Sequence, residues 1–525
     1  MKKTLLFLAL CLFLSSCGWF NKQPEIATVL AKHFDNKLYK KFDTVAYDLI
    51  FSKKMDEVRH NLSNPKVTKA FYAAHKNNPI LITRFYTNGG IDTLESYLKG
   101  SKADGFNPEI FHLNELTGLL KTLDSNKFKN IEEVYPVIAE LEIKTADALL
   151  KYSSFIKYGS VNPLRLFNRY SIAVKRPDSL KLDSVLNTED LVSVLKNAQP
   201  TSKSYVDLKR ELAVYRDNLK SENDPAIRII KLNMERLRWQ LPIQTDEVVM
   251  VNIPDFSLTW FNKSDTLTHM NVCVGGKREE GYAEKMKAYL KSGNLDDKPK
   301  NHETPQLVSV FNAIQVNPIW NIPVSIAQSE IYWQARKDPY YLSNNNIKVY
   351  MRGKQVYDPD TIQWDQYPRE KLPFEFKQGS GEGNALGKFK FIFDNSSSIY
   401  LHDTNNKRGF KLANRAISHG CVRIEKPLEF AQLMVRNKSQ YDDLRMDVNL
   451  PPVDTTRMPQ FKKKQAKRID TLNVFQLKPT WFATRKKVSV VISYYTAWAE
   501  NGKVQFRPDV YNYDGILWDA IKKYM

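Results

Sequence analysis

The feature that most constrains the fold is a change of residue pattern near position 247 of this 525-residue chain. From about 45 to 230, apolar residues recur at helical spacing, as in 140–150, with short breaks at glycines. From Glu247 the pattern becomes that of strands, beginning with 248–253. A chain with helices first and strands second is predicted to be α+β, and its length allows two to three domains.

The first seventeen residues have the pattern of an export signal. Two lysines precede an apolar run over 5–14, which is too short to span a bilayer comfortably. The run ends in Leu-Ser-Ser-Cys, which resembles a bacterial lipobox, so we expect residues 1–16 to be removed and Cys17 to be lipidated. An ordinary signal peptide that happens to contain Cys17 is the alternative. Because Gly18 rather than Asp follows, we expect a periplasmic protein anchored by its lipid to the outer membrane.

The number of cysteines and the net charge bear on two classes of protein, the disulfide-rich proteins and the nucleic-acid-binding proteins. Beyond the signal only Cys273 and Cys421 remain, so an exported chain of this size has no disulfide framework, and Cys273 between two valines is expected to be a buried strand residue. The net charge is +20, which often indicates nucleic acid. An exported protein is not expected to meet nucleic acid, whereas a polymer rich in carboxylates would be drawn to it. The basic run 462–468 is interpreted as part of a solvated linker.

The densest group of reactive side chains lies between His402 and Arg423. His402-Asp403 is followed, after fourteen residues, by Ser-His-Gly-Cys-Val-Arg, in which Cys421 is the cysteine. A thiol needs a base to become a nucleophile, and a glycine lets the backbone turn so that N–H groups can face an oxyanion. A lone cysteine is usually a small buried apolar residue. Two histidines, a serine and a glycine around one cysteine instead indicate a catalytic thiol.

This pattern resembles the signature of the YkuD-type L,D-transpeptidases. The flanking segments 383–391 and 399–404 resemble the larger YcbB-like branch, and 233–239 with 251–254 resemble the lead-in to its catalytic domain. The resemblance is strong from about 230 onward and weaker before. It implies a mostly helical N-terminal scaffold domain, followed by a β-rich catalytic domain with an inserted helical capping subdomain.

The resemblance and the breaks in pattern together give a domain plan. Relatives often insert a three-helix wall-binding module near 220, for which this chain has no room, and the polar stretch from Lys277 to His302 is longer than the usual connection. The predicted parts are a signal peptide 1–16, a tether 17–45, a helical scaffold domain 46–230 and a catalytic domain 231–525, with a capping subdomain at about 321–380 and a basic linker at 449–472.

By resemblance, four residues carry the chemistry. Cys421 is the nucleophile and His402 the general base, held in place by the backbone carbonyl of Asp403. A nearby imidazolium would lower the pKa of the thiol. His419 supports the site and is the alternative base.

Further residues are expected to shape the site. Ser418 hydrogen-bonds within the turn, and the N–H groups of Gly420 and Cys421 form the oxyanion hole. Arg423 holds a substrate carboxylate or locks the loop, and Asn384 and Gly387 shape the substrate entrance.

The implied reaction is cross-linking of peptidoglycan without ATP, in support of the cell wall and cell shape. The thiolate attacks the carbonyl of the third stem residue, D-Ala leaves, and the side-chain amine of a neighbouring stem resolves the thioester into a 3→3 cross-link. A carbapenem is expected to acylate the same thiol. No cofactor or metal is implied, since no ligand spacing occurs. The alternatives are an L,D-carboxypeptidase, a thiol endopeptidase on stem peptides, or a catalytically dead wall-binding lipoprotein.

Overall fold

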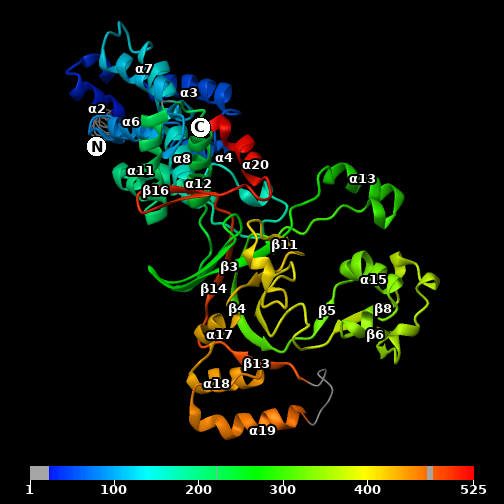
Figure 1. Ribbon diagram of the computed structural model, residues 1–525. Coiled ribbons are helices and arrows are strands. Elements are labelled where there is room, and N and C mark those ends of the chain that lie inside the picture. The colour runs from blue at the N-terminus through cyan, green and yellow to red at the C-terminus, as the bar shows by residue number, and fades with distance from the viewer. Residues whose placement is uncertain (1–22, 220, 470–476) are drawn as a thin grey trace, which may run out of the picture. The chain divides into compact units, whose positions relative to one another are not determined.

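A computed structural model describes residues 23–219, 221–469 and 477–525, which form two compact units (Figure 1). The helical unit runs to Ser160 and also takes Lys175–Gln240 and Ile521–Met525, and the strand-rich unit takes Val161–Val174 and Leu241–Ala520. The predicted signal and Cys17 lie outside the described residues. Within the described ranges, no helix combines the length and apolar character needed to cross a bilayer.

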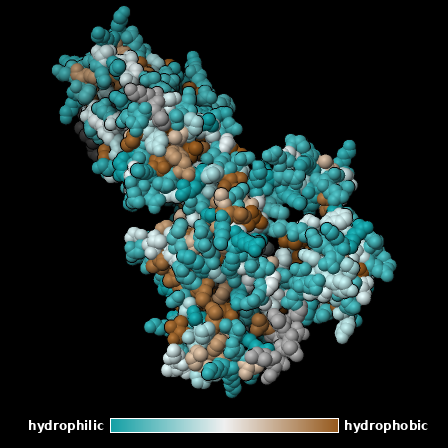
Figure 2. All heavy atoms as spheres, viewed as in Figure 1, coloured by the Kyte–Doolittle hydropathy of each residue, from teal (hydrophilic) through white to brown (hydrophobic). Residues whose placement is uncertain are grey.

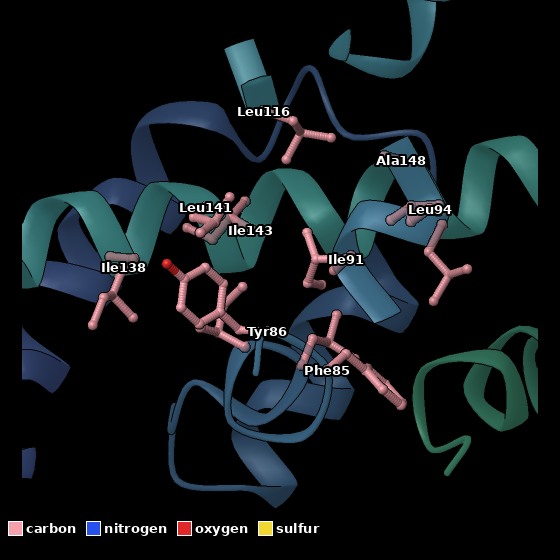
Figure 3. Close-up of a cluster of buried hydrophobic side chains, with 14 of the residues drawn as sticks. Phe85, Tyr86, Ile91, Leu94, Leu116, Ile138, Leu141, Ile143 and Ala148 are labelled. Carbon is pink, nitrogen blue, oxygen red and sulfur yellow. The ribbon is translucent and has the colours of Figure 1, made fainter. Parts of the chain in front are cut away.

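The helical unit is built around α8 (Val134–Tyr158), whose 25 residues are buried over most of their length. Figure 3 shows Phe85, Ile91, Leu141 and other apolar side chains gathered along this helix. The helices around it are α2 (Glu25–His33), α3 (Thr44–Val58), α4 (Pro65–Ala74), α5 (Ile80–Phe85), α6 (Gly90–Gly100), α7 (Leu113–Asp124), α9 (Ser179–Leu186), α10 (Leu191–Ala198), α11 (Lys203–Leu219) and α12 (Pro225–Arg238).

The predicted tether is wrong beyond residue 24. Helix α2 and the 3₁₀ turn Lys37–Lys41 belong to the helical unit, because Ile26, Leu30 and Tyr39 are buried in its core. Ile26 and Leu30 lie four residues apart, so they share one face of the helix. The helix has only nine residues, which is too short to give a strong periodic signal in the sequence.

The strand-rich unit is organised by a sheet that closes on itself. Among the described residues the pairing runs β3-β12-β10-β9-β4-β14-β1-β2 and returns to β3, while β11 (Ala416–Ser418) and β13 (Thr480–Ala483) pair at its margins. The closed path consists of β1 (Glu247–Asn252), β2 (Ser257–Asn262), β3 (Asp265–Gly275), β4 (Leu307–Val316), β9 (Phe389–Phe393), β10 (Leu401–His402), β12 (Val422–Ile424) and β14 (Ser489–Ser493). Closure leaves few free edges.

Strand β14 comes from near the C-terminus and completes the sheet. It pairs in parallel with β1 and antiparallel with β4, and it is buried on both faces. Cys273 in β3 is likewise buried, as the sequence predicted. After β14, the chain continues through β15 (Ala497–Glu500), β16 (Lys503–Phe506) and α20 (Tyr513–Ile521).

The inserted subdomain is mixed rather than helical. Strands β5, β6 and β8 lie together in Figure 1, and the sheet runs β5-β8-β6-β7. The subdomain has its own apolar core, which includes Trp364 and Phe376. Apolar and polar residues alternate along β8, so one face of this strand is buried and the other is at least partly exposed. The many aromatic residues of the subdomain made this alternation hard to recognise in the sequence. The elements are β5 (Trp320–Ile322), a continuous helix made of α14 (Val324–Ile326), a π turn (Ala327–Ile331) and α15 (Tyr332–Lys337), then α16 (Tyr341–Asn344), β6 (Ile347–Met351), β7 (Lys354–Gln355) and β8 (Phe374–Gln378).

Two further boundaries differ from the prediction. Residues Val161–Val174 fall in the strand-rich unit, where Tyr170 bridges to Gln306. The basic linker contains helix α19 (Met458–Ile469), which follows α17 (Pro427–Met434) and α18 (Lys438–Asp447). Lys464 in α19 pairs with Asp447 at 2.7 Å, so part of this run is fixed by an ion pair. Figure 2 shows the mostly hydrophilic surface expected from the net charge.

Candidate active site

Strand pairing brings five reactive side chains to one face of the sheet. His402 in β10 lies opposite Lys390 in β9 and opposite Arg423 in β12. Because side chains alternate along a strand, Tyr400 shares the face of His402, and Cys421 shares the face of Arg423. The predicted nucleophile and base therefore lie on one surface, although nineteen residues of chain separate the two strands.

Tyr400 is the immediate neighbour of the Cys421 thiol. Its hydroxyl and its backbone N–H both hydrogen-bond to the sulfur. Burial raises the pKa of Cys421, while these hydrogen bonds and the Lys390 and Arg423 cations act in the opposite direction. The environment therefore keeps the resting sulfur protonated, contrary to the expectation of a lowered thiol pKa.

His402 is buried and fixed in one tautomer. Its Nδ1 donates to the backbone carbonyl of Asp403, which can only accept, so in the neutral ring the lone pair lies on Nε2; the Leu386 carbonyl also contacts the ring. Burial, followed by the Arg423 and Lys390 charges, lowers the pKa of His402 to about 3. A neutral imidazole and a neutral thiol form a pair suited to general-base activation, in which the proton moves only as the sulfur attacks.

Asp403 acts through both its backbone and its carboxylate. Its carboxylate accepts the N–H groups of Lys388 at 2.8 Å and Thr404 at 2.7 Å and an ion pair from Lys407. Gly387 has φ +60°, and a Cβ there would lie 2.4 Å from the Asp403 carboxylate. Only glycine permits this approach, so Gly387 helps to hold the strand that carries His402.

The Ser-His-Gly-Cys turn is held by Ser418. The Ser418 Oγ donates to the Cys421 carbonyl at 2.6 Å and accepts the Gly420 N–H at 3.1 Å. Gly420 has φ +120°, which favours glycine. Since its N–H is already engaged, the predicted oxyanion donor at Gly420 is occupied, and the Cys421 N–H has no partner among the described residues.

Thr304, from a segment far away along the chain, also stabilises the Ser-His-Gly-Cys turn through hydrogen bonds. Thr304 Oγ1 donates to the Gly420 carbonyl and accepts the Gly275 N–H, each at 2.8 Å. Tyr511 donates to the Gly275 carbonyl at 2.7 Å. These contacts tie the nucleophile's turn to β3 and to the chain's C-terminal part.

His419 points away from these contacts and forms a separate cluster. Its Nε2 contacts the Glu330 carboxylate at 2.6 Å, and its ring lies 4.4 Å from that of His302. The hydrogen bond from His419 lowers the pKa of Glu330, while burial lowers that of His302. Glu330 belongs to the π turn of the inserted subdomain, and such turns are frequent at functional sites.

Arg423 and Asn384 were both predicted to contact substrate. The half-buried Arg423 guanidinium makes no ion pair with any described residue, and its buried Nε has no hydrogen-bond partner. Asn384 is buried instead, with its amide donating to the carbonyls of Gly379 at 2.8 Å and Pro318 at 3.1 Å. The Arg423 guanidinium is thus available to bind a ligand. The hydrogen-bond donors of the Asn384 amide are instead occupied by backbone carbonyls and fix the loop after β8.

Sequence reasoning missed Lys390, Tyr400, His302 and Glu330. Lys390 places its Nζ 3.8 Å from the centre of the Tyr400 ring, and it reaches the site only through the pairing of β9 with β10. Tyr400 had a local signal, since it stands two residues before His402 in a predicted strand. His302 and Glu330 lie in an insertion and a subdomain, and no local pattern marks them.

Comparisons with known proteins agree with this geometry. Residues 246–450 match the family model of the YkuD L,D-transpeptidase catalytic domain, and 66–212 match the model of a Scaffold domain. A Haemophilus influenzae protein named "Putative L,D-transpeptidase" is 28% identical over 301 residues, covering 56% of this chain and 51% of the relative. The chain thus spans about half the length of the curated relative that it matches.

The predicted order of a helical N-terminal part and a β-rich catalytic part is confirmed. The whole cluster around Cys421, with Lys390, Tyr400, His402 and Arg423, lies inside the catalytic match. The chain carries an L,D-transpeptidase catalytic domain of the YkuD family, preceded by a Scaffold domain.

Proposed function

We propose that this protein is a peptidoglycan L,D-transpeptidase that forms 3→3 cross-links through a cysteine acyl-enzyme. The observation that carries the proposal is the group on one sheet face: a half-buried thiol, a neutral histidine whose Nδ1 is held by a backbone carbonyl, and two cations, Lys390 and Arg423, that form no ion pair with any described residue. A stem peptide offers carboxylates that such cations would bind. The match of 246–450 to the transpeptidase catalytic domain supports the same reaction.

The steps follow from the roles of these groups. His402 Nε2 takes the Cys421 proton as the sulfur attacks the carbonyl of the third stem residue, and the Cys421 N–H faces the oxyanion. The C–N bond to D-Ala breaks, and His402 returns the proton to the leaving amine. The amine of a second stem then attacks the thioester, the C–S bond breaks, and the amine's proton ends on the sulfur.

Intact-protein mass after incubation with a carbapenem tests the thiol. We expect one adduct per chain on the wild type and none on Cys421→Ala, with equal circular dichroism for the two proteins. An adduct that survives in Cys421→Ala would overturn the thiol mechanism. No adduct on folded wild type would favour a catalytically dead wall-binding protein.

Product analysis with tetrapeptide stems then identifies the acceptor. Cross-linked dimers that lack one D-Ala are expected. Tripeptide alone would identify an L,D-carboxypeptidase, and cleavage of a different peptide bond would identify a thiol endopeptidase.

We also propose that the protein is exported and anchored at the outer membrane through a lipid on Cys17. The support is the lysine start, the short apolar run and the Leu-Ser-Ser-Cys ending. Fractionation of cells that make the full chain or Cys17→Ser tests this. Retention of Cys17→Ser in the outer-membrane fraction would contradict the anchor.

A further inference from the structure

A cavity of about 610 Å³ lies in the strand-rich unit beside the catalytic turn. One wall is the insertion between β3 and β4, with α13 (Tyr282–Ser292), and another is the helix from Pro323 to Trp333. His419 lies in the lining, whereas Cys421, His402 and Arg423 do not. The cavity is within the size range of ligand sites and shares one side chain with the nucleophile's turn.

The wall is built rigidly against that turn. The ring of His302, at the end of the insertion, lies 4.4 Å from that of His419 at an angle of 43°, and a Cβ on Gly275 would lie 1.7 Å from the His302 carbonyl. A Cβ on Gly420 would lie 3.5 Å from the same carbonyl. The end of the insertion is therefore packed against the backbone that carries Cys421, whereas its helix α13 has no buried residue.

The lining carries unused positive charge. Arg369 pairs with Asp296 at 2.7 Å, but Lys300 has no ion pair among the described residues. Arg169 also lines the cavity, and its buried Nε has no hydrogen-bond partner. Cations left without partners in a polar cavity suit a ligand that carries carboxylates.

A carboxylate–imidazole pair stands at the edge of the cavity. Glu330 and His419 are 2.6 Å apart, and about half and one third of their side chains are exposed (48% and 36%). Glu330 contacts the Nε2 atom of His419 and thereby orients the ring, which leaves Nδ1 as the second ring nitrogen. An ammonium arriving beside this pair meets a negative charge and a group able to take its proton.

We propose that this cavity binds the acyl acceptor, a peptide with free carboxylates and a primary amine, and that His419 takes the proton of that amine. The inference rests on the transpeptidase function, which needs a second ligand besides the donor at Cys421. One ammonium proton passes to His419 or solvent before attack. The neutral amine then forms the new C–N bond, the C–S bond breaks, and the second N–H proton ends on the sulfur. Glu330 is a positioning residue that acts through His419.

A double variant tests the binding role of the cavity. Arg169→Gln/Lys300→Gln removes two cations that have no ion pairs, and Lys462→Gln/Lys463→Gln removes two exposed cations of α19 as the control. The full chain is given a tetrapeptide donor and a tripeptide acceptor with a free side-chain amine. We expect the acceptor KM to rise at least about tenfold in the cavity variant, comparable to one lost charge-assisted hydrogen bond, with acylation by a carbapenem changed less than about twofold. The control should leave both unchanged.

Glu330→Gln tests the positioning role. We expect the turnover of transfer to fall about a hundredfold, as for impaired acid–base catalysis, with the acceptor KM changed less than about twofold. Hydrolysed tripeptide should increase relative to the cross-linked product.

The outcomes separate the two proposals. Wild type that forms no acyl-enzyme would overturn the proposed function together with this inference. Wild type that is acylated while the cavity variant keeps its acceptor KM would overturn the acceptor site alone. A cavity variant that is acylated slowly would assign the cavity to the donor instead and would also overturn the inference.

Discussion

Two arginines, one in each unit, differ in how many protein groups bind their guanidinium after it is removed from water. Arg238 in the helical unit is fully buried, and it donates to Glu235 at 3.3 Å, to the Tyr205 hydroxyl at 2.7 Å and to the Asp104 carbonyl. Its guanidinium also lies 4.4 Å from the centre of the Phe106 ring. Among the described residues, protein groups thus surround this charge through both terminal nitrogens and the ring face, although its Nε has no hydrogen-bond partner.

Arg423 in the strand-rich unit has no such partners. Burial lowers its pKa, and the two sulfurs of Cys273 and Cys421 are the only groups that act in the opposite direction. A charge held in this state costs free energy, which a bound anion would recover. The comparison teaches that buried charge with protein partners supports the fold, whereas buried charge without them marks the place where a ligand belongs.

The largest expected effect concerns the base that shares the sheet face of Arg423. His402→Ala should slow acylation by a carbapenem about 10²- to 10⁴-fold, because no other group would take the thiol proton. His419→Ala is the matched control and should slow acylation far less, since His419 contacts Glu330. Stopped-flow fluorescence measures both rates. If His419→Ala were the slower variant, His419 would be the base.

Arg238→Met should strongly destabilise the fold. It removes the donor to the Glu235 carboxylate, the Tyr205 hydroxyl and the Asp104 carbonyl, and breaking such a buried network costs about 3–5 kcal/mol. Urea unfolding followed by circular dichroism measures the change. Arg59→Met, at an exposed position in the same unit, should change stability by less than about 0.5 kcal/mol. Equal stability of the two variants would refute a structural role for Arg238.

Glu142 extends the comparison to a buried carboxylate. Burial raises its pKa to about 7, although it accepts the N–H groups of Leu81 and Ile82, each at 2.9 Å. The folded state therefore binds the proton more tightly than the unfolded state. The corresponding stability is fully present below about pH 4.5 and is lost as the pH rises through 7, an effect of about 3 kcal/mol. Glu142→Gln should flatten this dependence in urea unfolding between pH 4.5 and 8, and an unchanged slope would contradict the raised pKa.

Arg423→Met should leave the fold intact and weaken donor binding. Loss of one charge-assisted hydrogen bond corresponds to about 1.5–3 kcal/mol, or roughly a ten- to hundredfold rise in donor KM. Thermal unfolding should be unchanged or slightly improved, because an unpaired buried charge has been removed. Strong destabilisation would instead mean that Arg423 serves the fold as Arg238 does.

The smallest expected effect is a flat pH profile. Because the pKa of His402 is lowered to about 3 and that of Cys421 is raised, both groups stay neutral from pH 5 to 8. The second-order rate of acylation by a carbapenem should vary less than about twofold over this range. An inflection near pH 6.5 would show that His402 titrates as an ordinary histidine.

The sequence by itself determined the order of the parts and predicted two residues that meet on one sheet face. Periodicity separated helices from strands at Glu247, and the resemblance of 402–423 to a family signature predicted that His402 and Cys421 lie together. Both signals are local, because the side-chain period follows from backbone geometry and the turn residues are contiguous. The same local reading led to wrong predictions where a helix is very short, as in α2, or rich in charged residues, as in α19.

Only the tertiary structure decided what surrounds the thiol. Lys390 and Arg423 meet Cys421 through strand register, and His302 and Glu330 reach His419 from segments about ninety residues or more away along the chain. Whether a cation has a partner, and whether burial or charge prevails in a pKa, depends on every group packed around it. That packing exists only once the sheet has closed, so the protonation state of Cys421 and His402 could not be predicted from their own sequence.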